Sequence, residues 1–120
     1  MSYKHHRDSL VSLINDLSNE DSAIIVVEGK RDFKALTSLG IQKERILQCA
    51  QHPERELEQF IMTGAKKVIP LFDADRTGRI RAQRFSRYFQ GQTLIDRSYA
   101  QRLINLGFTY TEEMDDRAVY

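Results

Sequence analysis

Acidic side chains stand directly after two apolar runs of this sequence. The run Ala23–Val27 leads into Glu28, and the run Lys67–Phe72 leads into Asp73 and, two residues on, Asp75. At an extended strand end, residues two apart point the same way, so Asp73 and Asp75 hold two carboxylates side by side. Such a pair repels itself unless a cation lies between the groups, and hard oxygen ligands suit Mg²⁺ or Mn²⁺. If the two runs are neighbouring strands, Glu28 joins the same acidic pocket.

A glycine and basic residues follow each acidic element. Gly29 and Gly78 permit tight turns and a close approach of the backbone to a phosphate. The charged residues expected beside that phosphate are Lys30, Arg76 and Arg79, with Asp32 as a supporting acid. An alternative is that the acids only cap the helices that follow, because Asp is a good N-cap. The convergence of three acids at two strand ends favours the metal site over simple capping.

Positive charge is gathered in one part of the chain. The net charge is only +1, but residues 76–102 hold seven arginines and one acid, a net +6, and the other residues hold eleven basic against sixteen acidic side chains, a net −5. In the helix expected there, Arg84 and Arg87 lie opposite the inward side chains Ala82, Phe85 and Phe89. Arginine grips phosphate oxygens with a planar fork, and an ordinary solvated helix face mixes charges of both signs. The segregation therefore favours a nucleic acid, RNA or DNA, as the partner.

The elements that position these residues alternate between strand and helix. Strands are expected at Ala23–Val27, Arg45–Cys49 and Lys67–Phe72, with a weaker fourth at Gln92–Ile95. Pro70 lacks an amide donor, so its strand has a free edge there or a bulge. Alternation of this kind predicts an α/β fold of three layers, with a mainly parallel sheet of about four strands covered by helices on both faces.

Apolar spacing indicates five helices. One precedes the first strand, with Leu10, Leu13, Ile14 and Leu17 as its stripe. The others are a helix with Phe33 and Leu36 that Gly40 closes, one from Pro53 to about Gly64, one from about Thr77 to Gln90, and one with Tyr99, Leu103 and Leu106 that ends at Gly107.

The length of 120 residues suits a single domain. Its core is expected at about 23–95, with an N-terminal helix in 1–20 and a loosely attached acidic tail in 111–120. No apolar stretch reaches the ~20 residues of a membrane span, and no secretion signal is seen, so a cytoplasmic protein without a membrane partner is expected. Cys49 is expected to be a buried structural thiol, and His5 and His6 to face solvent.

The two acidic motifs together resemble a known family. Val26 to Asp32 followed by a helix, and then Pro70 to Gly78 about forty residues later, is similar to the Toprim domain of bacterial-type primases, type IA and type II topoisomerases, OLD-type nucleases and maturases of small ribosomal RNA. The similarity spans roughly Ala23 to Ile95. Each motif is short, but their order, strand context and separation make the pair fairly specific.

The resemblance implies a compact α/β domain that binds a divalent metal and manages phosphodiester chemistry. It assigns acid/base work to Glu28 and magnesium to Asp73 and Asp75. Some relatives carry a further acid beyond the Asp-x-Asp pair, whereas arginine dominates that stretch here, so the number of metals stays open. The chain looks like a stand-alone small Toprim protein, a nuclease-type enzyme rather than a primase or topoisomerase.

Three other functions are compatible with parts of the sequence. A haloacid-dehalogenase-like phosphatase would use Asp73 as nucleophile and Asp75 as acid/base, but its motif normally opens the chain and no lysine follows Lys67. An EF-hand loop from Asp73 fails because its twelfth position is Arg84. The serious alternative is a nucleic-acid-binding or accessory module that keeps the Toprim fold, is inactive alone and recruits a protein partner in a processing or replication complex.

Overall fold

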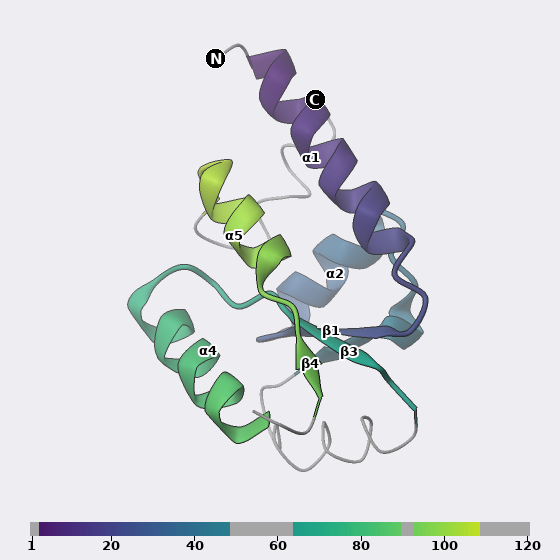
Figure 1. Ribbon diagram of the computed structural model, residues 1–120. Helices are drawn as coiled ribbons and strands as arrows, with labels where there is room; N and C mark the ends of the chain where they lie inside the picture. Colours follow the sequence, from purple (N-terminus) through teal and green to yellow (C-terminus); the bar gives the residue numbers. More distant parts are fainter. Residues whose placement is uncertain (1–2, 49–63, 90–92, 109–120) are drawn as a thin grey trace.

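The protein is an α/β domain in its computed structural model, which describes residues 3–48, 64–89 and 93–108 (Figure 1). In chain order the elements are α1 (Tyr3–Ser18), β1 (Ala23–Val27), α2 (Lys30–Ser38), the 3₁₀ turn η1 (Lys43–Arg45), β2 (Ile46–Gln48), β3 (Lys67–Pro70), α4 (Arg76–Phe89), β4 (Leu94–Ile95) and α5 (Ser98–Asn105).

The strands form one parallel sheet in the order β2-β1-β3-β4. The central strand β1 pairs with both neighbours, so that Ile25 lies opposite Ile46 on one side and Ile69 on the other. All five residues of β1 are buried, which explains why its sequence is continuously apolar rather than alternating. The predicted parallel α/β sheet is therefore confirmed, including the weak fourth strand.

Successive residues of β1 point into two different cores. Ile25 and Val27 pack with the apolar stripe of α1 and with residues of α2 and α5 on one face. Ile24 and Val26 pack with Val68 and with Phe85 of α4 on the other. Figure 1 shows the same division, with α4 on the opposite side of the sheet from α1, α2 and α5. The predicted three layers are thus present.

Pro70 marks the point where pairing on one side of β3 stops. Strand β4 pairs only with Lys67 and Val68, while Pro70 still lies opposite Val26 of β1. The Leu71 amide donates to Val26 O at 2.8 Å, so the nitrogen of the preceding residue, Pro70, faces the β4 side. A proline nitrogen has no hydrogen to donate, and β4 has already ended there. Of the two expected solutions, the free edge is the one found.

The predicted boundaries shift slightly. Strand β3 ends at Pro70 rather than Phe72, Arg45 belongs to η1 rather than to a strand, and α4 begins at Arg76 rather than Thr77. Gly40 ends the α2 region with φ +98°, a conformation that favours glycine. The predicted helix from Pro53, Cys49 and the tail 111–120 lie outside the described residues, as does the placement of His5 and His6 side chains.

A polar network links the loop before β1, strand β3 and the start of α5. Lys67 Nζ lies 2.8 Å from Glu20 Oε1 and 3.0 Å from Asp96 Oδ2, and the Tyr99 hydroxyl donates to the same Glu20 oxygen at 2.8 Å. Burial first, and then the Glu20 hydrogen bond, raises the pKa of Tyr99 to about 12. Among the described helices, none combines the length and apolar character needed to cross a bilayer.

Candidate functional site

The ends of β1 and β3 lie side by side and bring Glu28 against Asp73. Because the two strands are parallel neighbours, the residues that follow them emerge at the same edge of the sheet. There the Asp73 amide donates to Glu28 Oε1 at 2.8 Å. The sequence prediction that Glu28 joins the Asp73 motif is therefore matched by a direct contact.

Arg81 of α4 completes the surroundings of Glu28. Its guanidinium donates to Glu28 Oε2 at 3.1 Å, so both carboxylate oxygens are engaged by protein groups. The Glu28 side chain is only 13% exposed, whereas Arg81 is 52% exposed and reaches the site from its rim. This ion pair was not predicted from the sequence. In the structure Arg81 follows the buried Gly78 by three residues and so shares the helix face that meets the strand ends.

Burial raises the pKa of the Glu28 carboxyl. The negative charges of Asp73 and Asp75 raise it further, while the Asp73 amide and the Arg81 charge oppose them. A carboxyl group that holds its proton more tightly than usual is suited to general acid or base work near neutral pH.

Asp75 caps the first turn of α4. Its Oδ1 accepts the Gly78 amide at 2.7 Å, three residues on, and its backbone carbonyl accepts the Arg79 amide at 3.0 Å. This is the N-cap role that the sequence offers as the alternative to a metal site. Because the cap engages Oδ1, Oδ2 is the oxygen through which Asp75 would hold a cation.

Gly78 is required by packing. A Cβ at this position would collide with the backbone carbonyl of Asp73, so the first turn of α4 approaches the end of β3 closely only because residue 78 is glycine. The sequence reasoning had expected Gly78 to let a phosphate approach. Gly29 differs, since a Cβ there meets nothing within 4 Å and its φ of −156° is ordinary extended backbone.

Asp32 supports the other strand end. It is 7% exposed, and its Oδ2 accepts the Gly29 amide at 3.2 Å across the first turn of α2. This contact fixes the backbone immediately after Glu28, which agrees with the supporting role expected for Asp32.

The predicted phosphate-binding residues separate into two groups. Lys30, Arg76 and Arg79 are exposed at the first turns of α2 and α4, beside the acidic edge, and Arg79 Nε also donates to Ala74 O at 3.1 Å. Arg84 and Arg87 are exposed farther along α4. From ~1.5 Å of rise per residue, Arg87 lies roughly 16 Å along the axis from Arg76. Arg76 and Arg87, at the two ends of this row, are therefore expected to contact different phosphates.

Asp73 and Asp75 are the residues whose carboxylate oxygens could hold a magnesium ion. The described residues contain no group of three His, Cys, Asp or Glu side chains arranged as a metal site. Mg²⁺ is commonly bound through one or two carboxylates together with water and substrate phosphate, so Asp73 and Asp75 suffice as a donor set. Each Glu28 oxygen accepts one hydrogen bond, from the Asp73 amide or from Arg81, and retains a second lone pair.

Comparison with known proteins finds relatives that the chain matches over part of their length. The chain is similar to a UPF0292 protein of Methanosarcina barkeri, with 38% identity over 90 residues that cover 73% of this chain and 62% of the relative. A UPF0292 protein of Thermococcus onnurineus is 35% identical over 89 residues, covering 74% and 65%. One from Methanocaldococcus jannaschii is 32% identical over 77 residues, covering 63% and 60%.

The chain resembles the UPF0292 proteins. It spans 60% to 65% of the length of these curated relatives. No family model matches the chain. A solved structure of a protein from Aquifex aeolicus shares the fold, with a TM-score of 0.76 and 27% identity over 85% of this chain and 94% of that one. The names of these proteins state no activity, so function is argued from the site.

Proposed function

We propose that this protein cleaves phosphodiester bonds of nucleic acid with the help of Mg²⁺, using a site of the Toprim type at the ends of β1 and β3. The observation that carries the proposal is the contact between Glu28 and the Asp73 amide, which joins the two acidic motifs. Support also comes from the raised pKa of Glu28 and from the exposed cations of the first turns of α2 and α4.

Each group at this edge has a distinct role in the proposal. Asp73 and Asp75 hold the metal, which polarises the phosphodiester when bound. Glu28 exchanges a proton with the attacking or the leaving oxygen, for which its raised pKa suits it. Lys30, Arg76 and Arg79 offset the charge that develops on the phosphate. Arg81 orients Glu28 through its hydrogen bond to Oε2. That hydrogen bond has to break for Oε2 to take part in the proton transfer.

A second candidate is a nucleic-acid-binding or accessory module without activity of its own. The observation in its favour is that the acids already serve the fold. Glu28 bonds Arg81 and the Asp73 amide, and Asp75 caps α4. In this alternative the arginines of α4 bind the nucleic acid and a partner supplies the chemistry.

The two candidates are separated by incubating the purified protein with end-labelled RNA and DNA, single-stranded and structured, in Mg²⁺, Mn²⁺ or chelator. Glu28→Gln keeps an acceptor for the Asp73 amide, and Asp75→Asn keeps an N-cap, so both variants preserve the local structure. Asp21→Asn, at an exposed position, serves as the matched control.

Metal-dependent cleavage that disappears in both site variants and persists in the control supports the enzyme. Cleavage that survives in the site variants contradicts it. Salt-sensitive binding without cleavage favours the accessory module.

A further inference from the structure

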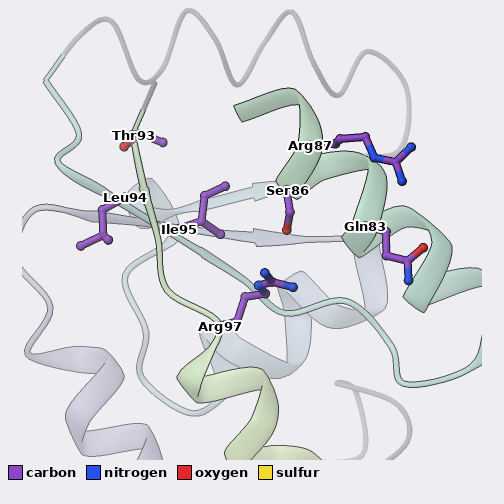
Figure 2. Close-up of a pocket in the computed structure, with 7 residues that line it drawn as sticks. All are labelled: Gln83, Ser86, Arg87, Thr93, Leu94, Ile95 and Arg97. Carbon is purple, nitrogen blue, oxygen red and sulfur yellow. The ribbon is translucent and has the colours of Figure 1, made fainter. Parts of the chain in front are cut away.

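A cavity of about 550 Å³ lies between the second half of α4 and the edge strand β4 (Figure 2). Helix α4 contributes Gln83, Ser86 and Arg87 to its wall, and the β4 segment contributes Leu94 and Arg97 among others. Cavities of this size accommodate small ligands or one unit of a longer one. Of these residues, only Arg87 was among the predicted phosphate-binding residues.

Two positive charges line the cavity, and no described carboxylate pairs with them. They belong to Arg87 and Arg97. The nearest acid in sequence, Asp96, is already engaged by Lys67 and by the Ser98 amide and hydroxyl. An anion is therefore the ligand that this charge favours, and the arginine fork suits phosphate oxygens.

A second hollow extends the cavity across α4. It measures about 430 Å³, is lined by Ile80, Gln83, Arg84 and Arg87, and shares Gln83 and Arg87 with the first. We call the surface that the two hollows share the basic groove and define it by Arg84, Arg87 and Arg97. The first turns of α4 carry Arg76 and Arg79 beside the acidic edge.

The groove also offers apolar surface and polar donors. Leu94 is 64% exposed although it belongs to the sheet, and Ile95 lines the same cavity. Ser86 Oγ is buried in the wall without a hydrogen-bond partner, so a rotation of its side chain would let it donate to a ligand. Phosphate oxygens beside the arginines and a sugar or base against Leu94 would match this lining.

We propose that the basic groove binds a single-stranded segment of the nucleic acid, with successive phosphates on Arg84, Arg87 and Arg97. The proposal rests on the proposed function in one respect, namely that the same strand continues to the acidic edge. Leu94, exposed beside the arginines, offers an apolar surface to a base, and bases are free to meet such a surface in a single strand rather than in a duplex.

The test measures binding without chemistry. Fluorescence anisotropy with a labelled single strand of about ten nucleotides, in chelator and between about 50 and 200 mM salt, compares Arg87→Ala/Arg97→Ala with Lys34→Ala/Lys43→Ala. The control double variant removes the same charge from two exposed positions on α2 and η1. We expect the groove variant to bind roughly tenfold more weakly and to lose about 1.4 from the slope of log affinity against log salt, at ~0.7 per phosphate contact.

Equal losses in the two double variants would overturn the proposal, because the effect would then be one of net charge. Equal affinity of a matched duplex, with the same dependence on Arg87 and Arg97, would overturn the single-strand assignment. Because binding is measured in chelator, an absence of metal-dependent cleavage would defeat the proposed enzyme and leave this result standing. If Arg87→Ala/Arg97→Ala cleaved as fast as the wild type at limiting substrate, the proposed groove would be wrong and the proposed enzyme would stand.

Discussion

Glu28 and Asp73, which stand 45 residues apart in the chain, are joined by a 2.8 Å hydrogen bond from the Asp73 amide to Glu28 Oε1. The bond links the backbone at the end of one strand to the side chain at the end of its neighbour. With the Arg81 contact to the other oxygen, it makes Glu28 a structural residue as well as the candidate acid or base. Changes at Glu28 should therefore affect both stability and activity, and the choice of substituent separates the two.

Glu28→Ala should destabilise the fold by about 1–3 kcal/mol, because it leaves the Asp73 amide and Arg81 without their acceptor. Glu28→Gln retains a carbonyl oxygen for the amide and should cost less than about 1.5 kcal/mol. Urea unfolding of the two variants measures the difference. Equal losses of stability in the two variants would show that the hydrogen bond from the Asp73 amide adds nothing to the effect of the Glu28 charge.

Gly78→Ala should be strongly destabilising, by about 3 kcal/mol, since its Cβ would meet the Asp73 carbonyl and force the first turn of α4 away from β3. Gly29→Ala is the matched control. Its Cβ meets nothing within 4 Å, and the change should be neutral or stabilise by up to about 1 kcal/mol through the unfolded chain. Thermal unfolding checks both, and a Gly78→Ala protein as stable as the wild type would mean that α4 docks differently.

The raised pKa of Glu28 should make its contribution to stability depend on pH. The folded protein holds this proton more tightly than the unfolded chain, whose carboxyl titrates near 4.5. The stabilisation is thus fully present below pH 4.5 and is lost as the pH rises through the higher folded pKa. Glu28→Gln has no such proton, so the stability of wild type relative to this variant should fall as the pH rises across that window. Denaturant titrations at several pH values measure it, and a difference that rises with pH would indicate a lowered pKa instead.

Addition of Mg²⁺ should stabilise the folded protein through Asp73 and Asp75. At tenfold excess over Kd, binding to the folded state alone contributes about 1.4 kcal/mol, which raises the melting temperature by several degrees. Asp75→Asn keeps the helix cap and should abolish most of this shift, whereas the exposed Asp21→Asn should not. A shift that persists in Asp73→Asn and Asp75→Asn would place the metal elsewhere.

The sequence specified the strands well because their burial leaves a local pattern. The continuous apolar run of β1 reports a strand covered on both faces, and the acids that follow such runs must share one edge if the strands are neighbours. The break at Pro70 was anticipated for the same reason, since a missing donor is visible in the residue type. The Toprim resemblance, the metal and the nucleic acid remain predictions.

Other features of the site depend on helix placement, which has no local signature. The pair between Arg81 and Glu28 joins residues 53 apart and exists only because α4 packs across the end of β1. The role of Gly78 likewise requires knowledge of what its missing side chain would touch. Arg97 was counted only as part of a basic segment, and its place opposite Arg87 across a cavity arises from the fold.

Pro70 also determines which strand anchors the acidic edge of the sheet. Beyond this residue the chain is anchored to the β1 side by the Leu71 amide on Val26 O and the Asp73 amide on Glu28, and it has no ladder partner in β4. The contacts that hold both acidic motifs therefore run between β1 and β3, and the ladder pairs of β4 stop short of them. The proposed basic groove is connected to the acidic edge through α4, which carries Arg87 in the groove and Arg79 at the edge.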